Sequence, residues 1–399
     1  MRRLFFVLML AAAQPSASQP SAFEAPADLF YLHPLVNYAN PVRWQSAFER
    51  ERVAAGGMRI TVGSISTKDF ATTARVELVE PAHERLRFLF RFDWDESPHV
   101  DGGERQPWFG LEFQAVSTRF GDVGVEMLVH PASDKADLDV MPGLLWTNAS
   151  RRNYLRLGWR RDDGVYEDKN ELGGRQSATA AGPQWAVHAE AGRFAFAGEG
   201  TWLSSVQRTY PDAERSPDLW FFGERRRWSS HAVRYDFRNR RIELRFEHRD
   251  FERVERTQTG LGDARQESFW RHVRLAWEED FGAIWRARAS VHRLHYDNAF
   301  LSVEHRRREN MGSVFVARHV GQGNWIDLGW MSTDFEWTSD RDGSVYGRDQ
   351  SGLASKIAVG WTIEFYRKGQ GPAWVRALIS HEPDPQQFGG ANVQASMTF

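Results

Sequence analysis

The sequence predicts an all-β chain whose antiparallel strands close into a transmembrane barrel. Apolar and polar residues alternate from Gly56 to the end of the chain, which is the period of a strand with two different faces. Short and long connections alternate between the strands, which is typical of a membrane barrel. No stretch after the N-terminus approaches the ~18 consecutive apolar residues that a membrane-spanning helix needs.

The final stretch, residues 391–399, shows the alternation most clearly. Every odd position is apolar and every even position is polar. Phe399 is expected in the aromatic girdle at the edge of the bilayer, where barrel strands carry aromatic residues. We therefore predict that this strand closes the barrel by pairing with residues 58–66.

Eighteen strands are predicted, with sixteen as the alternative count, because one hairpin is ambiguous in each of 130–150 and 184–203. An even number is typical of bacterial barrels, and the strands approach the length needed to cross a bilayer at a tilt. The predicted strands are 56–66, 71–80, 85–95, 107–118, 123–130, 137–147, 152–161, 184–191, 193–203, 227–237, 241–252, 267–278, 283–296, 308–320, 325–336, 354–366, 373–382 and 390–399.

The connections predict the orientation of the barrel. Tight turns follow the even strands, and long Asp-, Arg- and Gly-rich connections mostly follow the odd ones. With both ends of the barrel on the inner side, the short turns are periplasmic and the long loops are extracellular. The long connections are predicted at 96–106, 161–183, 204–226, 253–266, 297–307 and 338–352.

The N-terminal part of the chain differs from the strands. A basic pair, Arg2-Arg3, precedes a short apolar run and three alanines, a pattern typical of a secretory signal. An aromatic, proline-broken segment follows, which is either a periplasmic or lumen-facing segment or an ordered lead-in to the first strand. The expected organisation is a signal peptide at 1–22, cleaved between 13 and 22, an N-terminal segment at 23–55 and a barrel at 56–399.

The polar face of the predicted strands is charged, and its cations are nearly all arginines. The only lysines in the chain are Lys68, Lys135, Lys169, Lys356 and Lys368. In a barrel this face lines the lumen. The candidate lumen and solute-contact residues are Arg87, Arg91, Glu112, Arg156, Arg234, Asp236, Glu243, Arg245, Glu247, Arg274, Arg286, Arg288, Lys356, Glu364 and Arg376.

These charges allow more than one interpretation. Guanidinium groups suit the carboxylates and phosphates of anionic solutes through their two-pronged geometry. Alternatively, the arginines pair with acidic residues on neighbouring strands, as the alternation of basic and acidic residues at 241–249 invites, and only stiffen the wall. A GC-rich genome would also favour arginine over lysine without selection on function.

Enzymatic and cofactor chemistry is not indicated by the sequence. The absence of cysteine excludes disulfides, cysteine-ligated zinc and covalent haem attachment. No hydrolase, metalloprotease or nucleotide-binding motif is present. His292 and His295 are three residues apart, which puts them on opposite faces of a strand and disfavours a metal site. We therefore predict no catalytic residues, no metal and no cofactor.

The signal, the alternating strands and the closing pattern Val393-x-Ala395-x-Met397-x-Phe399 resemble the outer-membrane β-barrel class of Gram-negative bacteria. In that class the last strand and its final Phe are read by the barrel-insertion machinery, so the resemblance implies that Met397 and Phe399 form the insertion signal. The strand number and the arginine-rich face are similar in plan to eighteen-stranded sugar porins and to anionic-polysaccharide export channels. No motif assigns the chain to either group.

The resemblance implies a location in the bacterial outer membrane, with the lipid bilayer and the insertion machinery as partners. The expected function is a channel that passes hydrophilic solutes or polymer, anionic or saccharide in nature, through a charged lumen. The alternative is a structural barrel that holds a periplasmic partner in a secretion, polysaccharide-export or electron-transfer complex. A barrel enzyme and a soluble secreted β-protein are the remaining alternatives, and nucleic acid is not an expected partner.

Overall fold

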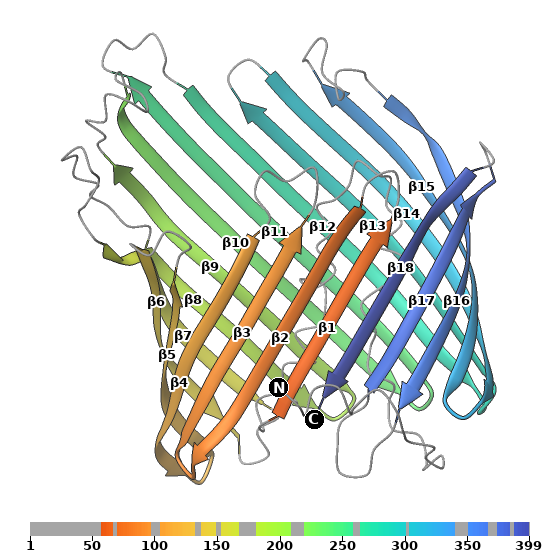
Figure 1. Ribbon diagram of the computed structural model, residues 1–399, viewed down its shortest axis with the longest axis horizontal. Helices are drawn as coiled ribbons and strands as arrows, with labels where there is room; N and C mark the ends of the chain where they lie inside the picture. The colour runs from red at the N-terminus through yellow and green to blue at the C-terminus, as the bar shows by residue number, and fades with distance from the viewer. Residues whose placement is uncertain are drawn as a thin grey trace, which may run out of the picture.

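The computed structural model describes residues 57–66, 70–96, 104–131, 137–148, 153–166, 181–208, 219–257, 264–300, 303–339, 350–365, 373–383 and 387–398. These residues form eighteen strands (Figure 1). The strands are β1 Gly57–Ser66, β2 Phe70–His83, β3 Leu86–Glu96, β4 Glu104–Thr118, β5 Gly121–Pro131, β6 Asp137–Thr147, β7 Tyr154–Tyr166, β8 Ala181–Ala191, β9 Phe194–Arg208, β10 Leu219–Phe237, β11 Arg240–Thr257, β12 Ala264–Phe281, β13 Trp285–Phe300, β14 Val303–Gly321, β15 Asn324–Ser339, β16 Gln350–Phe365, β17 Ala373–Glu382 and β18 Gln387–Thr398.

The strands form one antiparallel sheet that closes on itself. Each strand pairs with the strands before and after it in sequence, and β1 also pairs with β18. Figure 1 shows these two strands side by side. In this seam Arg59 lies opposite Thr398, Val62 opposite Ala395 and Ser66 opposite Ala391. The predicted strand count and the predicted closing pair are both confirmed.

Apolar and polar residues that alternate along each strand lie on opposite faces of the barrel wall. In β11, Leu244 is 48% exposed on the outside, whereas its neighbour Glu243 is 1% exposed on the inside. Exposed apolar side chains recur at the same level on strand after strand, which forms the surface that a hydrocarbon layer requires. Members of this apolar belt include Phe88, Leu111, Val125, Leu157, Leu244, Leu275, Val291, Val316, Leu328, Val359 and Ile379.

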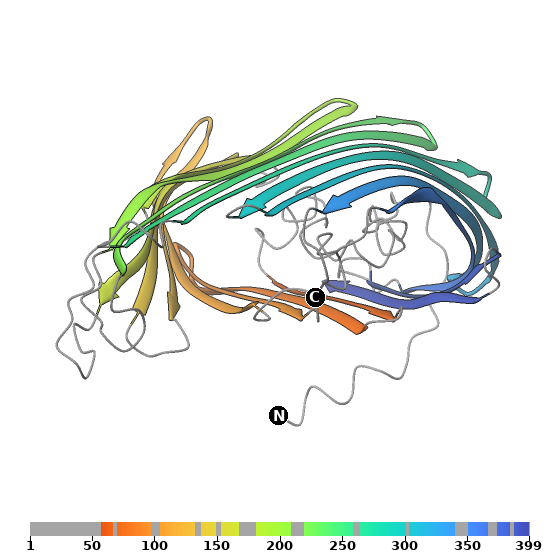
Figure 2. The ribbon, with the colours of Figure 1, turned by 90° about the horizontal axis from the view of Figure 1, so that it is seen from above.

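The barrel has a flattened rather than circular outline. Figure 2 shows β10–β16 as one broad wall facing β1–β3 and β17–β18, with the shorter strands β4–β8 at one narrow end. The broad wall contains the longest strands, including β10 and β14 with 19 residues each. The inner faces of the two long sides therefore lie across the lumen from each other.

The tight turns lie where the sequence predicts them. Two residues connect β8 to β9, β10 to β11 and β14 to β15. Their backbones enter the left-handed region that two-residue hairpins need, with φ of 61° at Gly192, 55° at Arg238 and 50° at Gln322. Gly323 has φ of 75°, and a Cβ there would lie 2.2 Å from the carbonyl oxygen of Glu364, so that turn requires glycine.

The predicted long connections are wrong in length on the broad wall. Residues 253–266 and 297–307 are mostly strand, because β11 continues to Thr257, β12 starts at Ala264, β13 continues to Phe300 and β14 starts at Val303. Backbone pairing continues beyond the ~9–11 residues that cross a bilayer. These strand extensions lie outside the apolar belt and carry polar residues. Some of these residues form ion pairs, such as Arg306 with Asp297 at 3.3 Å.

The predicted signal peptide at 1–22, the segment at 23–55 and Phe399 lie outside the described residues, so the predictions made for them stay predictions. The side chain of Met397 is likewise outside them, although its backbone pairs with Ile60. Among the described residues, no helix is long and apolar enough to cross a membrane.

The seam predicts a specific cross-link. Because the chain has no cysteine, Val62→Cys with Ala395→Cys introduces the only two thiols, at positions directly opposite each other. Mild oxidation should join them, because opposite strand residues satisfy the Cα spacing of a disulfide. A mobility shift on a non-reducing gel detects the disulfide. Val62→Cys with Gln394→Cys is the control, because one residue of offset turns the second thiol to the other face; efficient linkage of the control would contradict the register.

Candidate functional site: the inner wall of the barrel

The inner face of the wall contains the charged residues that the sequence singles out. Of the fifteen candidates, only Arg91 has a side chain outside the described part of the chain. The other fourteen lie on the face opposite the apolar belt, where most are nearly inaccessible to solvent. They are Arg87, Glu112, Arg156, Arg234, Asp236, Glu243, Arg245, Glu247, Arg274, Arg286, Arg288, Lys356, Glu364 and Arg376.

One group of ion pairs lies on β12, β13 and β16. The Arg286 guanidinium lies between two carboxylates, 2.7 Å from Asp280 and 3.0 Å from Glu364. Arg288, two residues further along the same face, lies 3.0 Å from Glu278. The indole of Trp325 stacks under Arg286, with 4.4 Å between the guanidinium carbon and the ring centroid. Each cation here is held by an anion on another strand of the same wall, either the adjacent β12 or, for Glu364, β16.

A second ion pair crosses an entire strand. Arg376 on β17 lies 3.2 Å from Asp327 on β15, and both side chains are at most 2% exposed. They meet over Gly360 of β16, where a Cβ would lie 3.2 Å from the carboxylate of Asp327. The Thr362 hydroxyl also donates to this carboxylate at 3.0 Å. The missing side chain at Gly360 is what lets the two charges reach each other.

The pattern continues around the barrel. On β8–β12, Arg234 pairs with Glu190 and Asp236, Arg241 pairs with Asp236, and Glu243 lies 3.8 Å from Arg245 and 3.5 Å from Arg274. At the narrow end, Arg87 pairs with Glu112 at 3.4 Å and Arg156 with Glu126 at 2.7 Å. Lys356 pairs with Glu382 at 3.1 Å.

Pairing with carboxylates, in most cases across strands, is therefore the arrangement that the structure has. Every described candidate cation lies within 4.0 Å of a carboxylate: Arg87, Arg156, Arg234, Arg245, Arg274, Arg286, Arg288, Lys356 and Arg376. Acidic partners that the sequence-based selection omits include Glu126, Glu190 and Glu278. The wall is rich in charge but locally close to neutral.

Glycines allow large inner side chains to lie flat along the wall. The Phe315 ring lies where a Cβ on Gly329 would be, at 2.1 Å, and the Leu378 side chain lies 2.3 Å from a Cβ on Gly360. Together with Met331 and Ala358, these two side chains form an apolar cluster on β14–β17. Arg376 lies over the Phe315 ring at 5.5 Å. The side chains cover neighbouring strands instead of standing upright from the sheet.

A hydrogen-bonded chain of four side chains lies on the inner face of β12–β14. His272 Nε2 is 3.1 Å from His292 Nδ1, His292 Nε2 is 3.0 Å from the Ser290 hydroxyl, and that hydroxyl is 2.9 Å from Ser313. All four residues are at most 7% exposed. The sequence alone does not indicate this hydrogen-bonded chain, because only the register of three strands brings its residues together.

Ser290, His292 and His272 have the order of a nucleophile, a base and an orienting group, but the described strands beside them supply no oxyanion hole. Ser290 lies mid-strand, and the strand pairs on both sides, so its backbone N–H groups are used by the sheet and offer no oxyanion hole. His295 lies on the opposite face from His292, beside Asp297 at 2.9 Å, as predicted. Within the described ranges, no group of three or more acidic residues or histidines could hold a metal.

Solved structures with similar folds are outer-membrane proteins. The OmpT loop-deletion mutant of Vibrio cholerae is 9% identical with a TM-score of 0.42, and the comparison covers 86% of this chain and 98% of that one. A bacterial polysaccharide outer membrane secretin is 12% identical with a TM-score of 0.40, covering 86% and 97%. The anion-selective porin of Comamonas acidovorans is 11% identical with a TM-score of 0.37, covering 86% and 98%.

No protein-family model and no curated protein matches the sequence. At these identities and scores, no residue role carries over from the similar structures. The closed eighteen-stranded sheet, with its apolar outside and charged inside, itself has the architecture of bacterial outer-membrane barrels. The predicted fold class and outer-membrane location are confirmed.

The buried pair of Asp327 and Arg376 predicts a strong effect on stability. Asp327→Asn should destabilise the barrel by about 3–5 kcal/mol, because it leaves a buried guanidinium without its anion. The measurement is the temperature at which the folded band is lost on a heat-modifiability gel. Adding Arg376→Met should restore much of the loss, since replacing both charges is far less costly than removing one. Equal instability of the single and double variants would contradict this account.

Proposed function

We propose that the protein is a channel that passes hydrophilic solutes across the outer membrane. The observation that carries this proposal is the charged inner face of the closed sheet, where inward-facing charged residues recur on strands from β3 to β17 while the outer face is apolar. A wall of charged side chains facing inward favours water over hydrocarbon in the lumen. Buried pairing keeps these side chains in fixed positions against the wall.

The pairing of the wall supports weak selectivity for charge. Arg286 is flanked by Asp280 and Glu364, and Arg376 is neutralised by Asp327, so the described residues on this side of the lumen carry no strong local excess of positive charge. Fixed charges select ions when one sign dominates. The proposal therefore favours neutral saccharide-like solutes, or a hydrated polymer, over strictly anionic ones.

The leading competitor is a barrel that holds a periplasmic partner. It shares the fold but needs no open passage, so electrical measurement separates the two. Purified protein in a planar bilayer should conduct ions in steps if the channel proposal holds. The absence of any current, for the full chain and for a variant lacking residues 1–55, would favour the partner-holding barrel.

Removing carboxylates from the wall should create selectivity. Asp280→Asn with Glu364→Gln leaves Arg286 without either anion, so the reversal potential in a KCl gradient should shift towards chloride. Glu336→Gln is the matched control, because Glu336 lies on the outer face with a side chain 59% exposed. A shift of equal size in the control, or no shift in the double variant, would contradict a conducting lumen lined by Arg286.

We propose a non-enzymatic role for the Ser290–His292–His272 chain. Its position within a fully paired stretch of sheet supports a structural polar network. A fluorophosphonate probe, which labels activated serines, should therefore leave the folded protein unlabelled. Labelling that disappears in Ser290→Ala but persists in Ser332→Ala would overturn this reading and support a barrel enzyme.

A further inference from the structure

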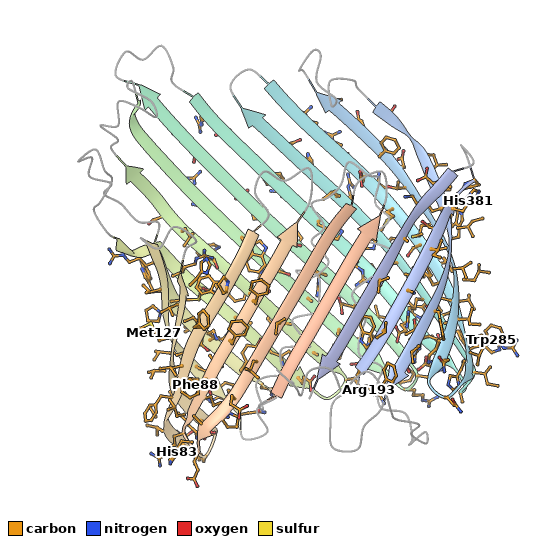
Figure 3. All side chains as sticks on the ribbon, viewed as in Figure 1. His83, Phe88, Met127, Arg193, Trp285 and His381 are labelled. Atoms are coloured by element: carbon orange, nitrogen blue, oxygen red, sulfur yellow. The ribbon has the colours of Figure 1, made fainter. Side chains whose placement is uncertain are left out.

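Arginines on the turn-side edge of the barrel stack on aromatic rings. Figure 3 labels two members of this group, Arg193 and Trp285, near the edge where the tight turns lie. The distances from guanidinium carbon to ring centroid are 4.5 Å for Arg119 on Phe120, 4.6 Å for Arg193 on Phe237, 5.2 Å for Arg238 on Phe237 and 5.5 Å for Arg318 on Trp285.

Two of these arginines converge from adjacent turns. Arg193 lies in the β8–β9 turn and Arg238 in the β10–β11 turn, and both guanidinium groups contact the single ring of Phe237. The backbone N–H of Asp236 donates to the carbonyl oxygen of Arg193 at 2.8 Å, which holds the first turn against the end of β10. We call Arg193, Phe237 and Arg238 the turn-side arginine site.

Within the described residues, no carboxylate compensates the charge of this site. Neither Arg193 nor Arg238 forms an ion pair within the part of the chain that the structure describes. The nearby carboxylate of Asp236 is bound to Arg234 and Arg241 on the inner face, at 2.8 Å from each. Other surface arginines are paired, such as Arg240 with Glu279 at 2.9 Å on the same edge. Two exposed guanidinium groups thus contact one ring, and neither has an anionic partner among the described residues.

The site also adjoins the surface that faces lipid. The Phe237 ring stacks on Tyr235 at 6.4 Å, and Tyr235 contacts Phe194 at 4.8 Å. Phe194 is 57% exposed, and Val233, the next outward residue of β10, is 44% exposed within the apolar belt. The guanidinium groups therefore lie at the level where the hydrocarbon layer ends and lipid headgroups begin.

We propose that the turn-side arginine site binds the phosphate of an anionic glycerophospholipid in the periplasmic leaflet. Guanidinium groups bind phosphate through paired, charge-assisted hydrogen bonds, and stacking on a ring pre-orients them. The acyl chains of the same lipid would lie along Val233 and Phe194. This site goes beyond the proposed channel function, because it lies on the outer surface and not in the lumen.

The test measures lipid binding by the purified full chain in detergent. Native mass spectrometry counts bound phosphatidylglycerol on the unaltered protein and on Arg193→Gln with Arg238→Gln. Affinity should fall about fivefold for each arginine removed. Arg265→Gln with Arg306→Gln is the matched control, because these exposed loop-side arginines already pair with Glu252 and Asp297; this variant should bind like the unaltered protein.

Additional measurements distinguish a lipid headgroup from inorganic phosphate and control for misfolding. A phosphate-free diacylglycerol glycolipid should bind equally weakly to both proteins, and inorganic phosphate should fail to displace phosphatidylglycerol. Unchanged binding by the double variant, an equal loss in the control, or displacement by inorganic phosphate would each overturn the proposal. Heat-modifiable migration on a gel verifies that each variant is folded. If the double variant does not fold, the two single variants replace it, and each should lose about fivefold in affinity for phosphatidylglycerol. Conductance should be unchanged throughout.

Discussion

The requirement that every backbone polar group inside a bilayer be paired within the protein determines this structure. A sheet with an open edge would leave the N–H and C=O groups of one strand without partners in hydrocarbon. The pairing of β1 with β18, with Val62 opposite Ala395, removes that edge. Closure then fixes which side of each strand faces lipid, so the two-residue period of the sequence becomes an apolar outside and a charged inside.

A charged inside would be unstable if its members were unpaired. Burying an ion without a counter-ion is far more costly than burying a pair, so the inner wall brings acids and bases together across strands. Arg286 with Asp280 and Glu364 shows the arrangement on one side of the barrel, and Arg87 with Glu112 shows it at the narrow end. The ion pairs that stabilise the wall also lower its net electrostatic field in the lumen. The stability of the barrel and its proposed preference for neutral solutes therefore have the same cause.

The sequence was a good guide to the strands and their faces but not to contacts between faces. The alternation of apolar and polar residues locates each strand and assigns Arg376 and Asp327 to the inner side, because this alternation can be recognised within a single strand. Their contact depends on β15, β16 and β17 having a particular register, which no single strand encodes. The same holds for His272 and His292. The strands extend beyond their predicted ends, to Thr257 in β11 and Phe300 in β13. The sequence does not predict these ends, because outside the bilayer charged residues continue a sheet as readily as they form a loop.

The glycines beneath Phe315 and Leu378 have a consequence for how such a barrel could change over evolutionary time. A ring that rests on Gly329 would have to swing upright if that position gained a side chain, while the hydrogen bonds of the sheet remained the same. In the proposed channel, the calibre of the lumen would then be adjustable by substitutions at single positions, separately from the number of strands. Diversification of solute preference would need neither a new loop nor a new strand.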